Sequence, residues 1–175
     1  MLLQGAAEMK KKEFLRNVAL FSQLNDYELD LIIQVVTEEF FAEGEEIVRE
    51  GDEGDSMFIV YEGTVGISLS LTLRLHGAAE SKEKVLTTLD SSMFPFFGEM
   101  ALLGIRERTA TCYANTPCKV LAITKKDFEE ICYEHLNIGY RVMENIGQVL
   151  CQRLQKANQD IKKLTTVLSL VMRKT

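Results

Sequence analysis

The chain has 175 residues, which suits one domain, and 46% of them are hydrophobic, too many for a disordered protein. The formal net charge of −6 disfavours broad binding to nucleic acid, which requires a basic face. No apolar run is long enough to span a membrane, and the amino terminus does not resemble a signal peptide, so we expect a cytoplasmic protein.

The first 36 residues are predicted to hold a tail followed by helices. Residues 1–12 form the expected N-terminal tail, and a single domain is expected over residues 13–175. Within residues 13–36, Asn25 is a typical helix N-cap, and Glu28, three residues later, completes a capping box. Helical spacing of the apolar side chains that follow supports N-terminal helices ahead of the next segment.

Residues 37–124 are predicted to form a β-roll. From Thr64 onward, small polar residues alternate with apolar ones, namely Val65, Ile67, Leu69, Leu71 and Leu73. A strand is also expected just before Glu62–Gly63, which we interpret as a tight hairpin turn, and His76–Gly77 as a further turn. Many short strands at regular spacing favour a mainly β jelly roll, or double-stranded β-helix, with flanking helices.

Residues 125–175 are predicted to be helical. Thr124 and Asp127 can cap a helix that ends near Glu134, and a long C-terminal helix is expected from about Asn137. Apolar residues then recur with alternating steps of about three and four, as in a coiled coil, at Leu150, Leu154, Ala157, Ile161, Leu164, Leu168 and Val171. This pattern favours a parallel homodimer, with packing on another protein as the alternative.

The segment from Phe97 to Thr111 contains the residues best suited to ligand binding. Gly98 precedes the carboxylate of Glu99 and a short stretch with helix propensity, so exposed N–H groups can face a ligand. Arg108 has the planar fork that matches a phosphate, whereas ionised Glu99 only accepts hydrogen bonds and suits sugar hydroxyls. These residues indicate a sugar-phosphate site, although an arginine in a charged patch is also typical of a solvated surface.

This segment resembles the phosphate-binding cassette of the cyclic-nucleotide-binding domain family, found in bacterial catabolite regulators and in protein kinase A regulatory subunits. The family pattern is F-G-E-[LM]-[AS]-L, five residues, then R-[TAS]-A, and the matching residues are Phe97, Gly98, Glu99, Met100, Ala101, Leu102, Arg108, Thr109 and Ala110. A second family motif, G-D-x-G-D-x-[ML]-[FY]-I-[VIL]-x-x-G-x-V, matches from Gly51 to Val65.

The resemblance implies a role for each matching residue. Arg108 is expected to pair with the exocyclic oxygens of a cyclic phosphate, and Glu99 to accept from the ribose 2′-hydroxyl. Backbone N–H groups of Gly98, Met100 and Ala101 are expected to line the phosphate and the sugar.

Other residues are expected around the base. Thr109 offers a hydroxyl to the phosphate or the purine, and the resemblance to catabolite regulators places Arg153 of the long helix over the base. A solvated helix surface explains Arg153 equally well. The remaining expected ligand-binding residues form an apolar wall and the end of the motif: Val85, Leu86, Phe97 and Ala110.

Three functions follow from this resemblance. The first is a stand-alone sensor for cAMP or cGMP, with a slight preference for cAMP, that signals through its C-terminal helix. The second is the sensor part of a catabolite-regulator-type transcription factor, which needs a DNA-binding segment absent before Thr175, so this chain is not expected to bind nucleic acid. The third is an interaction module whose pocket is blocked by the unusual approach Phe94–Pro95–Phe96.

The chain is not expected to be an enzyme or to hold a metal or cofactor. Its four cysteines form no C-x-x-C pair and are interpreted as reduced, apolar-like residues. The acidic cluster between Glu50 and Asp55 lacks the spacing of a calcium loop and is interpreted as a solvated turn.

Overall fold

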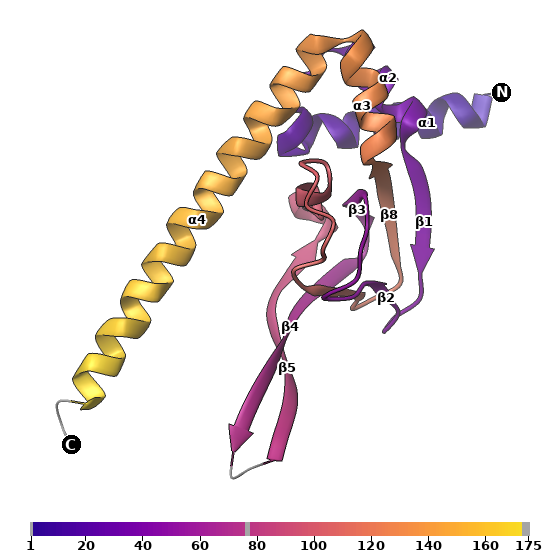
Figure 1. Ribbon diagram of the computed structural model, residues 1–175. Coiled ribbons are helices and arrows are strands. Elements are labelled where there is room, and N and C mark those ends of the chain that lie inside the picture. The colour runs from indigo at the N-terminus through magenta and orange to yellow at the C-terminus, as the bar shows by residue number, and fades with distance from the viewer. Residues whose placement is uncertain (1, 76–77, 173–175) are drawn as a thin grey trace.

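The computed structural model describes the backbone of residues 2–75 and 78–172, and the side chains of residues 7–69 and 85–172. Two β-sheets form a roll, with helices at one end and a long helix leaving it (Figure 1). The helices are α1 (Leu2–Asn17), η1 (Ala19–Phe21), α2 (Asp26–Val35), η2 (Ser91–Met93), η3 (Glu99–Ala101), α3 (Lys125–Glu134) and α4 (Leu136–Met172). The strands are β1 (Thr37–Phe41), β2 (Glu46–Val48), β3 (Ser56–Glu62), β4 (Thr64–Leu75), β5 (Ala78–Asp90), β6 (Phe96–Phe97), β7 (Thr111–Ala114) and β8 (Cys118–Thr124).

The strands form two four-stranded antiparallel sheets. One sheet has the order β1-β8-β3-β6 and the other β2-β7-β4-β5. Neighbouring strands within each sheet come mostly from distant parts of the sequence, as expected of a jelly roll rather than a meander. The predicted fold class, a mainly β roll with flanking helices, is confirmed.

The turn at Gly63 differs from the predicted hairpin. Strands β3 and β4 lie in different sheets, so Gly63 carries the chain from one sheet to the other. Its φ of +84° favours glycine, and an added Cβ would lie 2.5 Å from the carbonyl oxygen of Pro117. The long hairpin is formed instead by β4 and β5, which pair from Thr64 with Asp90 to Leu75 with Ala78. The predicted turn at His76–Gly77 lies outside the described residues.

Alternate residues of the central strand β3 pack into two separate hydrophobic cores. On β3, Met57 and Ile59 pack against the helices, whereas Phe58 and Val60 pack between the two sheets. This period of two is the ordinary consequence of strand geometry. Because both faces of β3 are buried, this strand is fixed between the helical end of the roll and its interior.

The N-terminal helices cover the first of these cores. Asn25 and Glu28 form the predicted capping box at the start of α2. Helix α1 begins at Leu2, so the structure has a helix where the sequence predicted a tail over residues 1–12. Two ion pairs explain how a polar stretch stays docked, since Lys11 contacts Glu38 at 2.7 Å and Lys12 contacts Asp30 at 2.5 Å.

Helix α4 is much longer than the domain that it packs against. It has 37 residues, which corresponds to about 55 Å. Its first turns pack on the helical core through Ile138, Val142 and Ile146, and Asn145 donates to the carbonyl of Leu20 at 2.8 Å. From Cys151 onward every described residue is exposed, and the helix extends away from the roll (Figure 1).

Candidate functional site

The connection between β6 and β7 forms one wall of a pocket at the open side of the roll. Phe97 ends β6, and Gly98 then adopts φ +75°, a left-handed conformation that favours glycine. The residues that follow make a single 3-10 turn, Glu99–Ala101, rather than a longer helix. Because an added Cβ at Gly98 would lie 3.0 Å from both Arg108 Nη1 and the Ser56 carbonyl oxygen, the turn packs tightly against the arginine.

Arg108 contributes to this pocket a positive charge that forms no ion pair with a carboxylate of the described residues, although the charge of Asp55 acts to raise its pKa. Its Nη1 donates to the Ser56 carbonyl oxygen at 2.8 Å, and its guanidinium lies 5.6 Å from the centre of the Phe58 ring. Burial lowers the pKa of Arg108, but an arginine pKa begins so far above neutrality that the group stays charged. Because no carboxylate among the described residues contacts it, a bound anion could form the direct ion pair that the guanidinium lacks.

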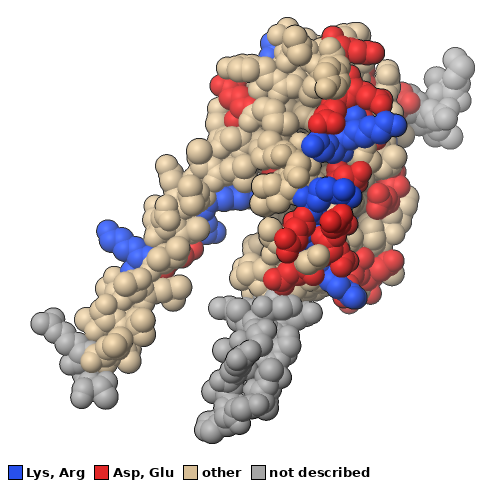
Figure 2. Space-filling model, viewed as in Figure 1, with Lys and Arg blue, Asp and Glu red and all other residues tan. Residues whose placement is uncertain are grey.

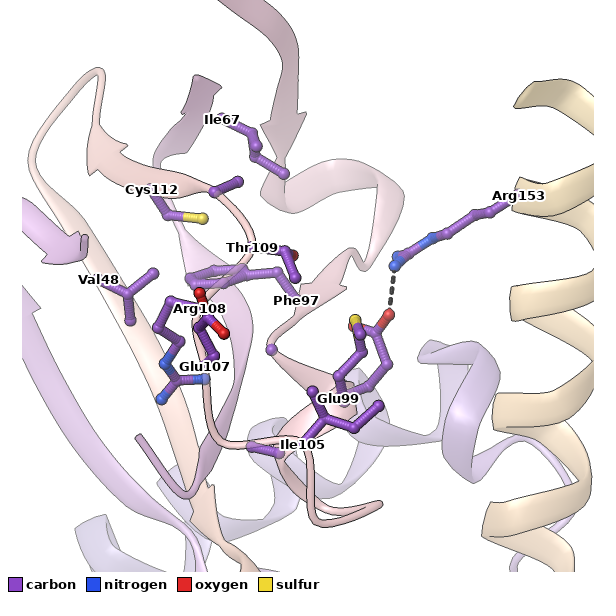
Figure 3. Close-up of a pocket in the computed structure, with 14 residues that line it drawn as sticks. Val48, Ile67, Phe97, Glu99, Ile105, Glu107, Arg108, Thr109, Cys112 and Arg153 are labelled. Atoms are coloured by element: carbon purple, nitrogen blue, oxygen red, sulfur yellow. Dashed lines mark hydrogen bonds and ion pairs between the residues drawn. The ribbon is translucent and has the colours of Figure 1, made fainter. Parts of the chain in front are cut away.

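Glu99 and Arg153 form an ion pair at the opposite side of the pocket. Glu99 is 4% exposed, and its Oε1 accepts from Arg153 Nη1 at 2.6 Å (Figure 3). Among the described residues no hydrogen bond reaches the other oxygen, Oε2. The carboxylate is therefore charge-compensated by α4 and still has an acceptor for a ligand hydroxyl.

The floor of the pocket is apolar. Ile67 of β4 and Cys112 of β7 face each other across paired strands and both line it (Figure 3). Burial raises the pKa of Cys112 to about 12, although the positive charge of Arg108 acts in the opposite direction. The thiol is thus neutral and serves as an apolar surface. The pocket volume is about 180 Å³, below the roughly 300–1,000 Å³ of pockets that enclose a drug-sized ligand.

Most of the predicted site residues line this one pocket. They come from the cassette and from α4, and they are Phe97, Gly98, Glu99, Met100, Ala101, Arg108, Thr109, Ala110 and Arg153. The hydroxyl-bearing Thr109 is exposed at its edge. The structure thus brings together residues that stand 56 positions apart, from Phe97 to Arg153.

The predicted apolar wall lies elsewhere. Val85 and Leu86 are on β5, are 54% and 52% exposed, and are not among the residues that line the pocket. The pairing of β5 with β4, with a register shift between Ile67 and Ser68, leaves both side chains about half exposed rather than inside the roll. The apolar surface of the pocket comes instead from other side chains, including those of Ile67 and Cys112 on its floor.

The unusual approach Phe94–Pro95–Phe96 does not fill the pocket. Phe94 packs on Phe14 of α1 with ring centres 5.1 Å apart, and Phe96 belongs to the core beneath the helices. None of the three residues lines the pocket. These three residues therefore do not block the pocket, contrary to the third of the functions considered from the sequence.

Sequence reasoning missed several lining residues. These are Val48, Ile67, Ile105, Glu107 and Cys112. Period-two alternation along β4 could have identified Ile67, since Val65 and Ile67 share a face. Val48 and Cys112 depend on how distant strands pair, and the sequence gives no local signal for that.

The described residues contain neither a cluster of metal-ligating side chains nor a membrane-spanning helix. No group of three potential metal-ligating side chains gathers among them. No helix in the described part of the chain is both long and apolar enough to cross a membrane.

Comparison with known proteins agrees with this geometry. The model of the cyclic nucleotide-binding domain family matches residues 38–135. The cGMP-dependent protein kinase egl-4 of Caenorhabditis elegans is 31% identical over 141 residues, which are 78% of this chain and 17% of the kinase. The cAMP-dependent protein kinase regulatory subunit of Dictyostelium discoideum is 31% identical over 139 residues, which are 79% of this chain and 41% of that subunit.

A solved structure shows the same architecture. The catabolite activator protein of Thermus thermophilus superimposes with a TM-score of 0.69 and 26% identity, covering 84% of this chain and 63% of that one. The chain spans between 17% and 41% of the two kinase-related proteins named above. The similarity therefore concerns one domain of larger proteins.

Proposed function

Because the chain belongs to the cyclic nucleotide-binding domain family, we propose that its pocket binds cAMP or cGMP and that the domain acts as a signal sensor. The observation that carries the proposal is Arg108, a half-buried guanidinium without a carboxylate partner among the described residues, in the same pocket as a buried carboxylate. A ligand with one anionic phosphate and one hydroxyl satisfies both groups.

The expected pose follows from these two groups. Arg108 pairs with the exocyclic phosphate oxygens, and Glu99 accepts the ribose 2′-hydroxyl through Oε2. Gly98 lets the sugar-phosphate approach the backbone closely. The volume of about 180 Å³ suits the sugar-phosphate better than a whole nucleotide, so the base extends toward Arg153 and the exposed Thr109.

Signalling through α4 is the second part of the proposal. Arg153 is the contact between the pocket and this helix, so a ligand that binds Glu99 acts directly on the α4 anchor. Ligand binding can shift the position of α4 only by its differential affinity for the two arrangements.

We further propose that two copies associate in parallel along α4. Leu154, Ile161, Leu164 and Leu168 follow the coiled-coil spacing and are between 59% and 70% exposed. Uncharged residues make up most of the visible surface of this part of α4 (Figure 2). An exposed apolar seam of this length favours burial against a second helix.

Isothermal titration calorimetry with cAMP and with cGMP tests the receptor proposal. Arg108→Gln should weaken binding by about ten- to a hundredfold, since a hydrogen bond to a charged group contributes about 1.5–3 kcal/mol. Arg106→Gln is the matched control, because Arg106 is an exposed arginine of the same loop that pairs with Glu53. Absence of binding by the unmodified protein, or equal affinity for Arg108→Gln, would reject the proposal.

Two alternatives are less well supported. The interaction module with a blocked pocket loses its main argument, because Phe94, Pro95 and Phe96 do not line the pocket. A role as the sensor part of a transcription factor remains compatible with the similarity to the Thermus protein, and the same titration applies to it. The family is a regulatory fold, which agrees with the expectation of a non-enzymatic role.

A further inference from the structure

Arg153 is held in place more firmly than an exposed helix residue would be. Its side chain is 49% exposed, yet its guanidinium makes three contacts on the side of the pocket. Nη1 donates to Glu99, Nη2 donates to the Phe96 carbonyl oxygen at 3.3 Å, and the guanidinium carbon lies 5.4 Å from the centre of the Phe96 ring. Two of the three contacts therefore come from Phe96.

We propose that Phe96 is a positioning residue that directs Arg153 toward Glu99 and thereby sets the ligand affinity of a pocket that it does not line. This inference rests on the proposed function, because the affinity concerned is that for a cyclic nucleotide. The aromatic face and the carbonyl of one residue fix a long side chain that would otherwise sample many rotamers.

The position of Phe96 is itself determined by its surroundings. It is 5% exposed and pairs with Ile59 across β6 and β3. Its neighbour Phe97 points to the other side of the strand, stacks on Phe58 at 5.2 Å and lines the pocket. Two adjacent residues of one short strand thus have different roles, because Phe96 contacts Arg153 of α4 whereas Phe97 lines the pocket.

The charge of Arg153 explains why its placement matters for an anionic ligand. Without Arg153, the buried carboxylate of Glu99 would face a phosphate in the same pocket, and like charges repel. With Arg153 in place, Glu99 is compensated through Oε1 while Oε2 can still accept a hydroxyl. Loss of the Phe96 ring should therefore weaken binding although that ring touches no ligand.

A double-mutant cycle measured by calorimetry tests this dependence. Phe96→Leu should weaken cyclic-nucleotide binding about three- to fivefold, the range expected when a partly exposed cation–π contact is lost. Arg153→Gln should weaken it about tenfold. In the Arg153→Gln background, Phe96→Leu should have no further effect, and Phe96→Tyr, which keeps the aromatic face, should retain the original affinity.

Phe128→Leu is the matched control for a general loss of packing. Phe128 belongs to the same core and is 2% exposed, so its replacement should lower stability and leave affinity unchanged. The proposal would be overturned by an unchanged affinity in Phe96→Leu, or by an equal loss with and without Arg153. If the unmodified protein binds neither nucleotide, the receptor proposal fails instead.

A measurement without ligand keeps the positioning role testable in that case. Amide hydrogen exchange across residues 149–157 of α4 should be faster in Phe96→Leu than in the unmodified protein, because Arg153 anchors the helix there. Phe128→Leu should not accelerate this segment relative to the rest of α4. Equal exchange in the two variants would overturn the positioning role.

Discussion

Gly54 offers a way to displace Arg108 without replacing it. A Cβ added at this position would lie 2.3 Å from Arg108 Nη2. The backbone of Gly54 does not have a positive φ, so alanine fits its conformation. The clash involves only the far end of a flexible side chain, and Gly54→Ala should move the guanidinium away from the Ser56 carbonyl oxygen while the fold is kept.

The expected magnitudes separate binding from stability. The displaced guanidinium loses one charged hydrogen bond, worth about 1.5–3 kcal/mol, but as a half-exposed group it regains water. Replacing glycine at a compatible position returns about 0.4–1 kcal/mol through the unfolded chain. The net loss of stability should be about 1 kcal/mol. The affinity should fall about tenfold or more, because the guanidinium of Arg108 is no longer preorganised to contact the phosphate.

Calorimetry and urea unfolding on the same preparations provide the assay. Gly147→Ala is the control, because an added Cβ there has no atom within 4 Å. It should leave affinity unchanged and raise stability by about 0.5–1 kcal/mol, the usual gain of alanine over glycine inside a helix. Unchanged cyclic-nucleotide affinity in Gly54→Ala would refute the idea that the hydrogen bond of Arg108 to Ser56 preorganises the guanidinium for the ligand. A loss of folding would show that the guanidinium cannot move as the geometry suggests.

Three further predictions follow from the same structure. Gly63→Ala should cost about 2–4 kcal/mol in urea unfolding, because it combines a positive φ with a clash against the Pro117 backbone; a loss below about 1 kcal/mol would contradict this. Cys112, with its pKa raised to about 12, should resist iodoacetamide at pH 8 in the folded protein while the exposed Cys151 reacts, as mass spectrometry of the labelled peptides can show. Ile161→Glu with Leu164→Glu should shift the protein from dimer to monomer in sedimentation, whereas Lys162→Glu, on another face of α4, should not.

Local sequence signals predicted the elements whose formation depends on neighbouring residues. The capping box of Asn25 and Glu28 and the cap at Thr124 both rely on contacts three residues apart, and both occur in the structure. The strand predicted from the alternation that begins at Thr64 has the same local origin and also occurs, as β4. The cassette residues could be identified because their spacing is itself the motif.

The errors arose where distant segments decide the outcome. Gly63 has the local features of a hairpin turn, and only the pairing of β3 with β8 shows that it joins two sheets. Val85 and Leu86 were expected to form the apolar wall, but the pairing of β5 with β4 leaves them about half exposed and away from the pocket. Helix α1 contains a lysine-rich stretch that appeared to be a tail, and ion pairs with Glu38 and Asp30 were not predictable from spacing.

The segment Phe94–Pro95–Phe96 before the cassette connects the N-terminal helices to the site. Phe94 has φ +52°, the only positive value at a non-glycine residue in the described chain, and it precedes a proline, where an extended backbone is usual. Such a conformation costs about 1–2 kcal/mol. The packing of the Phe94 ring on Phe14 offsets this conformational cost. The Phe14 ring in turn packs on Tyr61, with ring centres 4.7 Å apart. The contact of Phe94 with Phe14 thus connects α1 to one end of the segment, while Phe96 at its other end contacts Arg153. We therefore expect the contact of Phe94 with Phe14 to couple α1 to the strand β6 that holds Arg153.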